Sequence, residues 1–150
     1  RQEQREQLER ERIEPRPDVT LPRPEVAAPE TLPDERPCFD VRRIDVTGAE
    51  GRLAWLREAA ARYAGRCLGA KGVNAIAAAL QGALLERGLV TSRVVVPEQS
   101  LADGVLSLVV IPGRIGEVRF AEPQAHASLA TAFTMPRGAL LDLRDIEQAL

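Results

Sequence analysis

Few side chains in this sequence combine a reactive type with a spacing suited to covalent chemistry. The chain has two cysteines, Cys38 and Cys67, and one histidine, His126. Two cysteines without a nearby histidine make a poor zinc site, and a thiol nucleophile would need a base that only His126 could supply. His126 lies in the run AEPQAHASLA with no Ser or Cys at motif spacing. We interpret it as a solvated surface residue.

The carboxylates and glycines do not form a recognisable site either. Glu58, Glu86 and Asp103 fall on predicted exposed helix faces or in turns, where solvation explains them. The glycines are scattered as caps and turns and are not gathered in a phosphate-binding loop. We therefore predict a protein that is not an enzyme and that has no catalytic residues, no cofactor and no metal ion. The enzyme alternative rests on His126 alone.

Composition narrows the class of protein further. Twenty Lys and Arg against 22 Asp and Glu leave a net charge of −2, which does not favour a nucleic-acid partner. Hydrophobic residues make up 45% and aromatic residues only 3%, so we expect an aliphatic core. The longest apolar run, 75–80, is far shorter than the ~20 residues of a membrane-spanning helix. Because the sequence begins with Arg1, we expect it to be a piece of a longer protein.

The first 37 residues differ in composition from the rest. Residues 1–14 are almost wholly Arg, Glu and Gln, with only Leu8 and Ile13 apolar, which indicates a polar helix or a frayed tail. Residues 15–37 hold seven of the eleven prolines and lack hydrophobic periodicity. We interpret them as a semi-rigid linker, in preference to a proline-rich ligand for an aromatic groove.

Periodicity predicts the elements between residues 38 and 113. A strand over 38–48, a helix over 51–64, a helix over about 71–87 and strands over 89–97 and 105–111 follow in order. Gly88 is placed to end the second helix, and Asp103-Gly104 signals a turn. The predicted apolar faces of the two helices consist of Leu53, Leu56, Ala60 and Tyr63 and of Val73, Ile76, Leu80 and Leu84. This β-α-α-β-β order predicts an α+β module, a three-stranded sheet packed on two helices.

The pattern restarts after Pro112-Gly113. Residues 114–120 predict a strand, 127–133 a short helix, and Asp142 is a suitable N-cap for a helix that follows it. We interpret 114–150 as the truncated first part of a second copy of the unit.

Several runs of residues resemble a known family. They are RIDVTG (43–48), GRCL (65–68), ERGLVTS (86–92), PEQ (97–99), DGVL (103–106), GRI (113–115) and FTMP (133–136). Together with the order of elements they resemble the periplasmic polypeptide-transport-associated (POTRA) domains of two-partner-secretion outer-membrane transporters. These are the TpsB proteins of the haemolysin-activator and contact-dependent growth-inhibition types. One departure is Leu89, where the family usually has a tyrosine.

The resemblance implies a location and neighbouring segments. In that family a C-terminal β-barrel in the outer membrane follows the POTRA domains, and a helix such as 1–14 plugs the pore. The POTRA domains lie in the periplasm, an oxidising compartment, which implies a Cys38–Cys67 disulfide. The alternative is a pair of reduced, buried cysteines.

A three-stranded sheet has two open edges, and an edge can accept an extended chain. The resemblance makes the strand before Pro97 the edge, with the face of the first helix, Leu56 and Tyr63, as the neighbouring groove. We therefore expect recognition of an unfolded, exported TpsA-type partner polypeptide by β-strand addition, and its transfer to the barrel of the same parent chain. Arg93 has two open interpretations, a ligand contact or a charge that guards against aggregation. The candidate edge residues are Thr91, Ser92, Arg93, Val94, Val95 and Val96.

Two other functions fit the same sequence. The first is a structural spacer that holds the plug helix and the barrel without touching substrate. The second is a POTRA domain of a general outer-membrane barrel-assembly receptor. The residues do not decide between a haemolysin, an adhesin and a growth-inhibition toxin as cargo, and they leave the binding edge, the order of 1–37 and the oligomeric state open.

Overall fold

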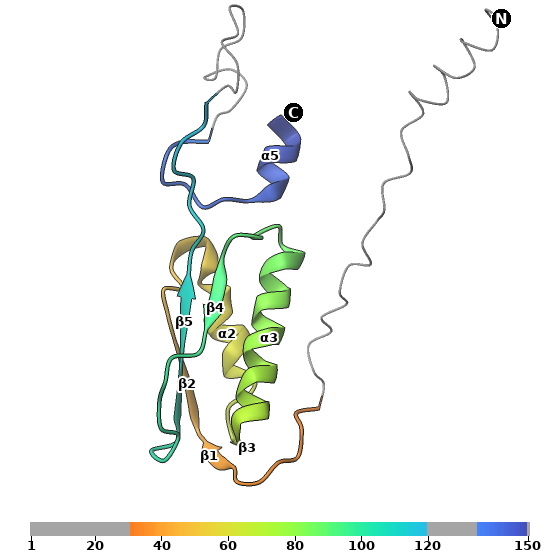
Figure 1. Ribbon diagram of the computed structural model, residues 1–150, viewed down its shortest axis with the longest axis vertical. Coiled ribbons are helices and arrows are strands. Elements are labelled where there is room, and N and C mark those ends of the chain that lie inside the picture. The colour runs from red at the N-terminus through yellow and green to blue at the C-terminus, as the bar shows by residue number, and fades with distance from the viewer. Residues whose placement is uncertain (1–30, 120–134, 150) are drawn as a thin grey trace, which may run out of the picture.

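The computed structural model describes residues 31–119 and 135–149. The predicted polar helix at 1–14, most of the linker, the predicted helix at 127–133 and His126 lie outside these residues. The elements in chain order are β1 (Phe39–Val41), β2 (Arg43–Thr47), the 3-10 helix η1 (Gly51–Leu53), α2 (Trp55–Ala61), β3 (Arg66–Leu68), α3 (Ala70–Glu86), β4 (Arg93–Val95), β5 (Val105–Ile111) and α5 (Leu143–Ala149) (Figure 1).

A three-stranded sheet of order β2-β5-β4 is the centre of the fold. The middle strand β5 runs parallel to β2 and antiparallel to β4. Helix α2 contacts β2, α3 contacts β4, and the two helices contact each other, so both cover one face of the sheet (Figure 1). The predicted α+β module with three strands on two helices is therefore confirmed.

The core between helices and sheet is aliphatic, as the composition predicts. Alternate residues of β5, namely Leu106, Leu108 and Val110, are buried and face the helices. The predicted helix faces supply the other side of this core, except that Tyr63 is only partly buried at its margin. At about 25 cal/mol per Å² of apolar surface, each such Leu or Ile contributes about 2–3 kcal/mol by leaving water.

The first predicted strand is two strands. The chain turns at Arg42, where the N–H groups of Arg42 and Arg43 both donate to the carbonyl of Gly104, at 2.8 and 3.3 Å. Strand β2 continues into the main sheet, while β1 pairs antiparallel with β3 in a separate two-stranded sheet. Sequence reasoning missed β3, because three residues directly before a helix carry no periodicity of their own.

The Cys38–Cys67 disulfide is formed. It joins the residue before β1 to the middle of β3, with a Cα–Cα distance of 5.3 Å. The alternative of two reduced cysteines is therefore wrong, and both small strands are fixed covalently to the N-terminal end of α3.

The second predicted unit differs from its expected pattern. Residues 114–119 form no strand. In this part of the described chain, the strand pairing is limited to one isolated antiparallel bridge between Arg114 and Leu140. An alternating sequence needs a partner strand, and within the described residues only the short segment 138–141 bonds to it. By contrast, Asp142 is the predicted N-cap of α5, since its carboxylate accepts the N–H of Arg144 at 3.0 Å.

Helix α3 ends as the glycine pattern predicts. The N–H of Leu89 donates to the carbonyl of Leu84, and that of Gly88 donates to Leu85, at 2.9 and 3.0 Å. This is a Schellman motif, which requires Gly88 at its φ of +80°. Leu89, at the position where a tyrosine is usual, is buried in the core and supplies the accompanying apolar contact.

We predict that the disulfide accounts for a large share of the stability of this small core. Its cysteines are separated by 29 positions, and closing a loop of that size is worth about 3–4 kcal/mol in the chain-entropy model. Urea unfolding with and without reductant should differ by that free energy. The Cys38→Ser/Cys67→Ser double variant, as control, should match the reduced chain and not respond to reductant. An equal unfolding free energy in both conditions would contradict the prediction.

Candidate functional site

Strand β4 lies at one edge of the sheet, and its pairing shows which backbone groups face outward. Arg93 pairs with Ile111, Val94 with Val110 and Val95 with Val109. The N–H of Val94 donates to the side chain of Gln81, at 2.9 Å, and is therefore not used by β5. In an antiparallel ladder alternate residues face the partner, so Arg93 and Val95 bond β5 while Val94 and Val96 face away from it.

The six predicted edge residues divide into a turn and a strand. Thr91 and Ser92 precede β4, and the N–H of Ser92 donates to Leu89 in a turn. The Ser92 side chain is fully buried, and its hydroxyl accepts the N–H of Gly113 at 3.0 Å. The predicted strand over 89–97 is thus wrong in length, because this turn occupies its first part.

The side chains of β4 alternate between the two faces of the sheet. Val94 and Val96 pack against the core, whereas Arg93 and Val95 are exposed on the face of the sheet opposite the helices. Val95 is 39% exposed and Ile111, opposite Arg93, is 54% exposed. Arg93 therefore stands beside exposed apolar side chains, a position that fits both of its interpretations.

Strand β4 ends where Pro97 removes a backbone donor. Continuing the register places Pro97 opposite Ser107, whose N–H and carbonyl both need partners. The Gln99 side-chain amide supplies them, since its Oε1 accepts the N–H of Ser107 and its Nε2 donates to the Ser107 carbonyl, both at 2.7 Å. The same Nε2 lies 3.2 Å from the Pro97 carbonyl, which confirms that Pro97 faces β5.

A groove of about 820 Å³ begins where β4 ends. Val96 and the segment up to Leu101 form one wall, and the first turns of α3 form the other. Phe39, which is 44% exposed, and the linker residues 35–37 lie at its margin. The lining combines apolar side chains with the charged Lys71 and Glu98. The outward-facing backbone of Val94 and Val96 thus leads directly into a mostly apolar groove.

The groove residues expected from the first helix lie elsewhere. Leu56 is fully buried in the core, so it cannot line a surface groove. Tyr63 and Trp55 line a separate hollow of about 310 Å³ between α2 and α3. The reason is the packing order: α2 covers β2, and α3 is the helix beside β4.

Glu35, in the predicted linker, caps α3 from 34 residues upstream. Its Oε1 accepts the N–H groups of Gly69 and Gly72, at 2.9 and 2.6 Å, and its Oε2 accepts that of Lys71 at 3.0 Å. These are donors that the first turn of a helix leaves unpaired. The last linker residues are therefore fixed onto the module. The sequence signal for this contact was the absence of a capping side chain at Gly69.

The cap changes the acidity of Glu35. Partial burial raises the pKa of this carboxyl group. The hydrogen bonds from the three backbone N–H groups, the shortest from Gly72, and the positive charge of Lys71 lower it by more. The net effect places the pKa below the usual 4.5. The carboxylate form is thus the one that the folded chain selects.

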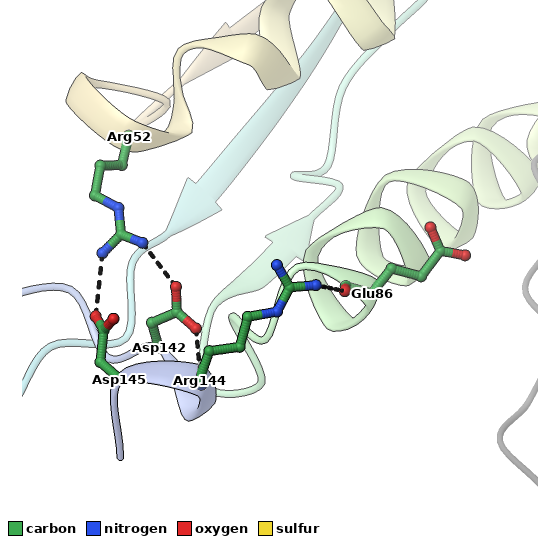
Figure 2. A network of polar contacts seen from close by, with 5 residues as sticks. All are labelled: Arg52, Glu86, Asp142, Arg144 and Asp145. Carbon is green, nitrogen blue, oxygen red and sulfur yellow. Dashed lines mark hydrogen bonds and ion pairs between the residues drawn. The ribbon is translucent and has the colours of Figure 1, made fainter. Parts of the chain in front are cut away.

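A second polar network joins the start of α5 to η1 and to the C-terminal end of α3 (Figure 2). Arg52 donates to Asp142 at 2.7 Å and lies 3.5 Å from Asp145. Arg144 donates to the carbonyl of Glu86 at the C-terminal end of α3, at 2.9 Å. Asp142 is 5% exposed, and both of its oxygens are bonded. This network fixes α5 on the first module.

The described residues provide no other site of recognised type. Among 31–119 and 135–149, no three His, Cys, Asp or Glu side chains gather as metal ligands. None of the helices in these two ranges combines the length and apolarity needed to cross a membrane.

Comparison with known proteins places the fold in a family. Residues 39–113 match the family model described as POTRA domain, ShlB-type, and residues 114–150 match a second POTRA domain model. The chain is 41% identical over 171 residues to outer membrane transporter CdiB-2 of Burkholderia pseudomallei strain 1026b, with 99% of this chain and 29% of the relative covered. It is 36% identical over 152 residues to outer membrane transporter CdiB of Escherichia coli O6:K15:H31, covering 99% of this chain and 24% of the relative. The chain therefore spans less than a third of the length of these relatives.

Solved structures agree with this result. CdiB from Escherichia coli superimposes with a TM-score of 0.66 at 34% identity, covering 99% of this chain and 26% of that structure. CdiB from Acinetobacter baumannii has the same fold, with a TM-score of 0.68 at 22% identity and coverage of 99% and 30%.

We predict that the Glu35 cap makes stability depend on pH in the acid range. Because its folded pKa is lowered, Glu35 stabilises the fold above pH about 4.5, and this contribution is lost as pH falls through the folded pKa. The Glu35→Gln variant should therefore have a lower Tm at pH 7, and the difference from wild type should shrink below pH 4.5. Asp34→Asn, the adjacent linker carboxylate, is the matched control and should keep the wild-type pH profile. Parallel profiles for wild type and Glu35→Gln would show that the cap is not energetically significant.

Proposed function

This chain belongs to the ShlB-type POTRA family, and we propose that it is a periplasmic module of a two-partner-secretion outer-membrane transporter. In this proposal it captures an exported partner polypeptide in extended form and passes it to the C-terminal β-barrel of the same parent chain. Residues 38–113 are then the first POTRA domain, and 114–150 the N-terminal part of the second. The similarity to outer membrane transporters named CdiB supports this transport role.

The observation that carries the proposal is the outer edge of β4. The Val94 carbonyl and the Val96 N–H face away from β5, and the described residues give them no hydrogen-bond partner. Unpaired strand groups of this kind bind an extended chain by main-chain hydrogen bonds, which require little sequence specificity. The adjacent groove, lined by Val73, Val96 and Leu101, can accept apolar side chains of that chain.

The Glu35 cap orders one margin of the groove beside this edge. It fastens the linker residues 35–37, which line the groove, to the start of α3. A binding surface that is ordered before the ligand arrives avoids part of the entropic cost of association.

A second candidate function is supported by the network in Figure 2. A spacer that sets the height of a barrel needs a rigid junction between successive domains. The paired Asp142 side chain and the donation from Leu143 to the Gly88 carbonyl, at 2.9 Å, form such a junction.

We predict that titration with the amino-terminal secretion-domain fragment of the exported partner shifts the amide resonances of 94–96 and of the groove. The Val96→Pro variant lacks the outward N–H and should bind about five- to tenfold more weakly, the loss of about one hydrogen bond. Val95→Thr, whose side chain lies on the opposite face, should bind as wild type. Absence of any shift at high micromolar fragment, or shifts confined to β2, would count against capture at this edge.

The spacer function leads to a different result in the intact transporter. Arg52→Glu places one further negative charge beside Asp142 and Asp145 and should loosen the junction. If the module is only a spacer, secretion should fall in Arg52→Glu and stay normal in Val96→Pro. If it captures substrate, Val96→Pro should reduce secretion at unchanged levels of folded transporter in the membrane.

A further inference from the structure

We propose that Gln81 closes the N-terminal half of the β4 edge and thereby limits strand addition to a short stretch at Val94 and Val96. This inference deepens the proposed capture function and rests on it for its biological meaning. The structural part of the inference is that Gln81 covers the N-terminal half of the β4 edge, and this part concerns the chain without its partner.

The seal consists of two hydrogen bonds from one side chain. The Gln81 Nε2 donates to the Ser92 carbonyl at 3.0 Å, and its Oε1 accepts the N–H of Val94 at 2.9 Å. A primary amide offers one acceptor and one donor side, as a peptide group of a neighbouring strand does. Gln81 therefore occupies the place of one residue of an added strand.

The helix holds this amide in position. Gln81 lies in the middle of α3 between the buried residues Leu80 and Gly82, and α3 is packed against the core along its length. Its side chain reaches sideways from the helix to the outer edge of β4, and Gln81 itself is half-buried. The Ser92 end is equally fixed, because its hydroxyl accepts the Gly113 N–H.

An incoming strand meets two different halves of the edge. To pair with Ser92 and the Val94 N–H it would have to displace Gln81, which exchanges two hydrogen bonds for two and gains little. At the Val94 carbonyl and the Val96 N–H it forms bonds that the free chain lacks. The partner segment is therefore an extended stretch of a polypeptide that starts its pairing at Val94 and runs toward the groove beyond Val96.

The seal also protects the free module. Exposed strand edges promote pairing between copies of a protein, and natural proteins shorten or cover such edges. With Gln81 in place, the described part of the β4 edge offers a second copy only the Val94 carbonyl and the N–H and carbonyl of Val96. An open stretch this short favours a partner that also fills the groove, and it disfavours edge-to-edge association between copies of the chain.

Hydrogen exchange of the free chain tests the seal without any partner. Gln81→Met keeps the length of the side chain but has no hydrogen-bonding amide, so the Val94 N–H should exchange at least tenfold faster than in wild type. Gln99→Met is the matched control, since Gln99 bonds β5 and not the outer edge, and it should leave Val94 exchange unchanged. Equal Val94 exchange in wild type and Gln81→Met, with unchanged Tm, would overturn the seal.

Titration with the secretion-domain fragment separates the seal from the capture function. In wild type the perturbed amides should begin at Val94, and in Gln81→Met they should extend to Ser92 with several-fold tighter binding. If exchange at Val94 accelerates in Gln81→Met but neither chain binds the fragment, capture fails and the seal stands. If the wild-type chain binds the fragment with Gln81 displaced and Ser92 paired to it, the capture function is supported. The proposal that Gln81 limits the length of pairing is then wrong.

Discussion

The packing of α3 against the three-stranded sheet is the contact on which the other features depend. Once this helix is buried along one side, the backbone groups at its two ends and at the adjoining strand edge must find partners away from water. Glu35 supplies them at the start of the helix, and the Gly88 turn supplies them at its end. Gln81 supplies them at the side, on β4. These hydrogen-bond partners come from the linker, from the turn after the helix and from the helix itself. The packing of α3 therefore determines the position of all three segments.

Two glutamines show how side chains complete a sheet that the backbone leaves unfinished. Gln99 takes the place that Pro97 cannot fill opposite Ser107, and Gln81 takes the place of a fourth strand beside Val94. The Gln99 side chain lies between β5 and the end of β4, and its hydrogen bonds stabilise the sheet. The Gln81 side chain lies on the outer edge, where it decides how much of β4 is open to another chain.

The segments on either side of the module are fixed to it by different means. The amino-terminal side is held by the Glu35 cap and the Cys38–Cys67 disulfide, and the carboxyl-terminal side by the buried carboxylate of Asp142 with Arg52. A core of aliphatic residues in so small a domain contributes limited stability, so such attachments have a large relative effect. The Glu35 cap also orders one margin of the groove beside β4, which suits a binding surface that must be in place before its ligand arrives.

Elements with local signals could be predicted from the order of amino acids alone. The bounds of β5, the buried face of α3, the turn at Gly88 and the cap at Asp142 follow from periodicity and capping within a few residues, and the structure has them as predicted. Tertiary structure decided the division of the first strand and the existence of β3, because a strand exists only with its partner. It also made α3, not α2, the neighbour of β4, which is why the groove is not lined by Leu56 and Tyr63. The hydrogen bonds of Glu35 and Gln81 could not be predicted from local patterns for the same reason. Their partners lie more than ten residues away in the chain and are brought close only by the fold.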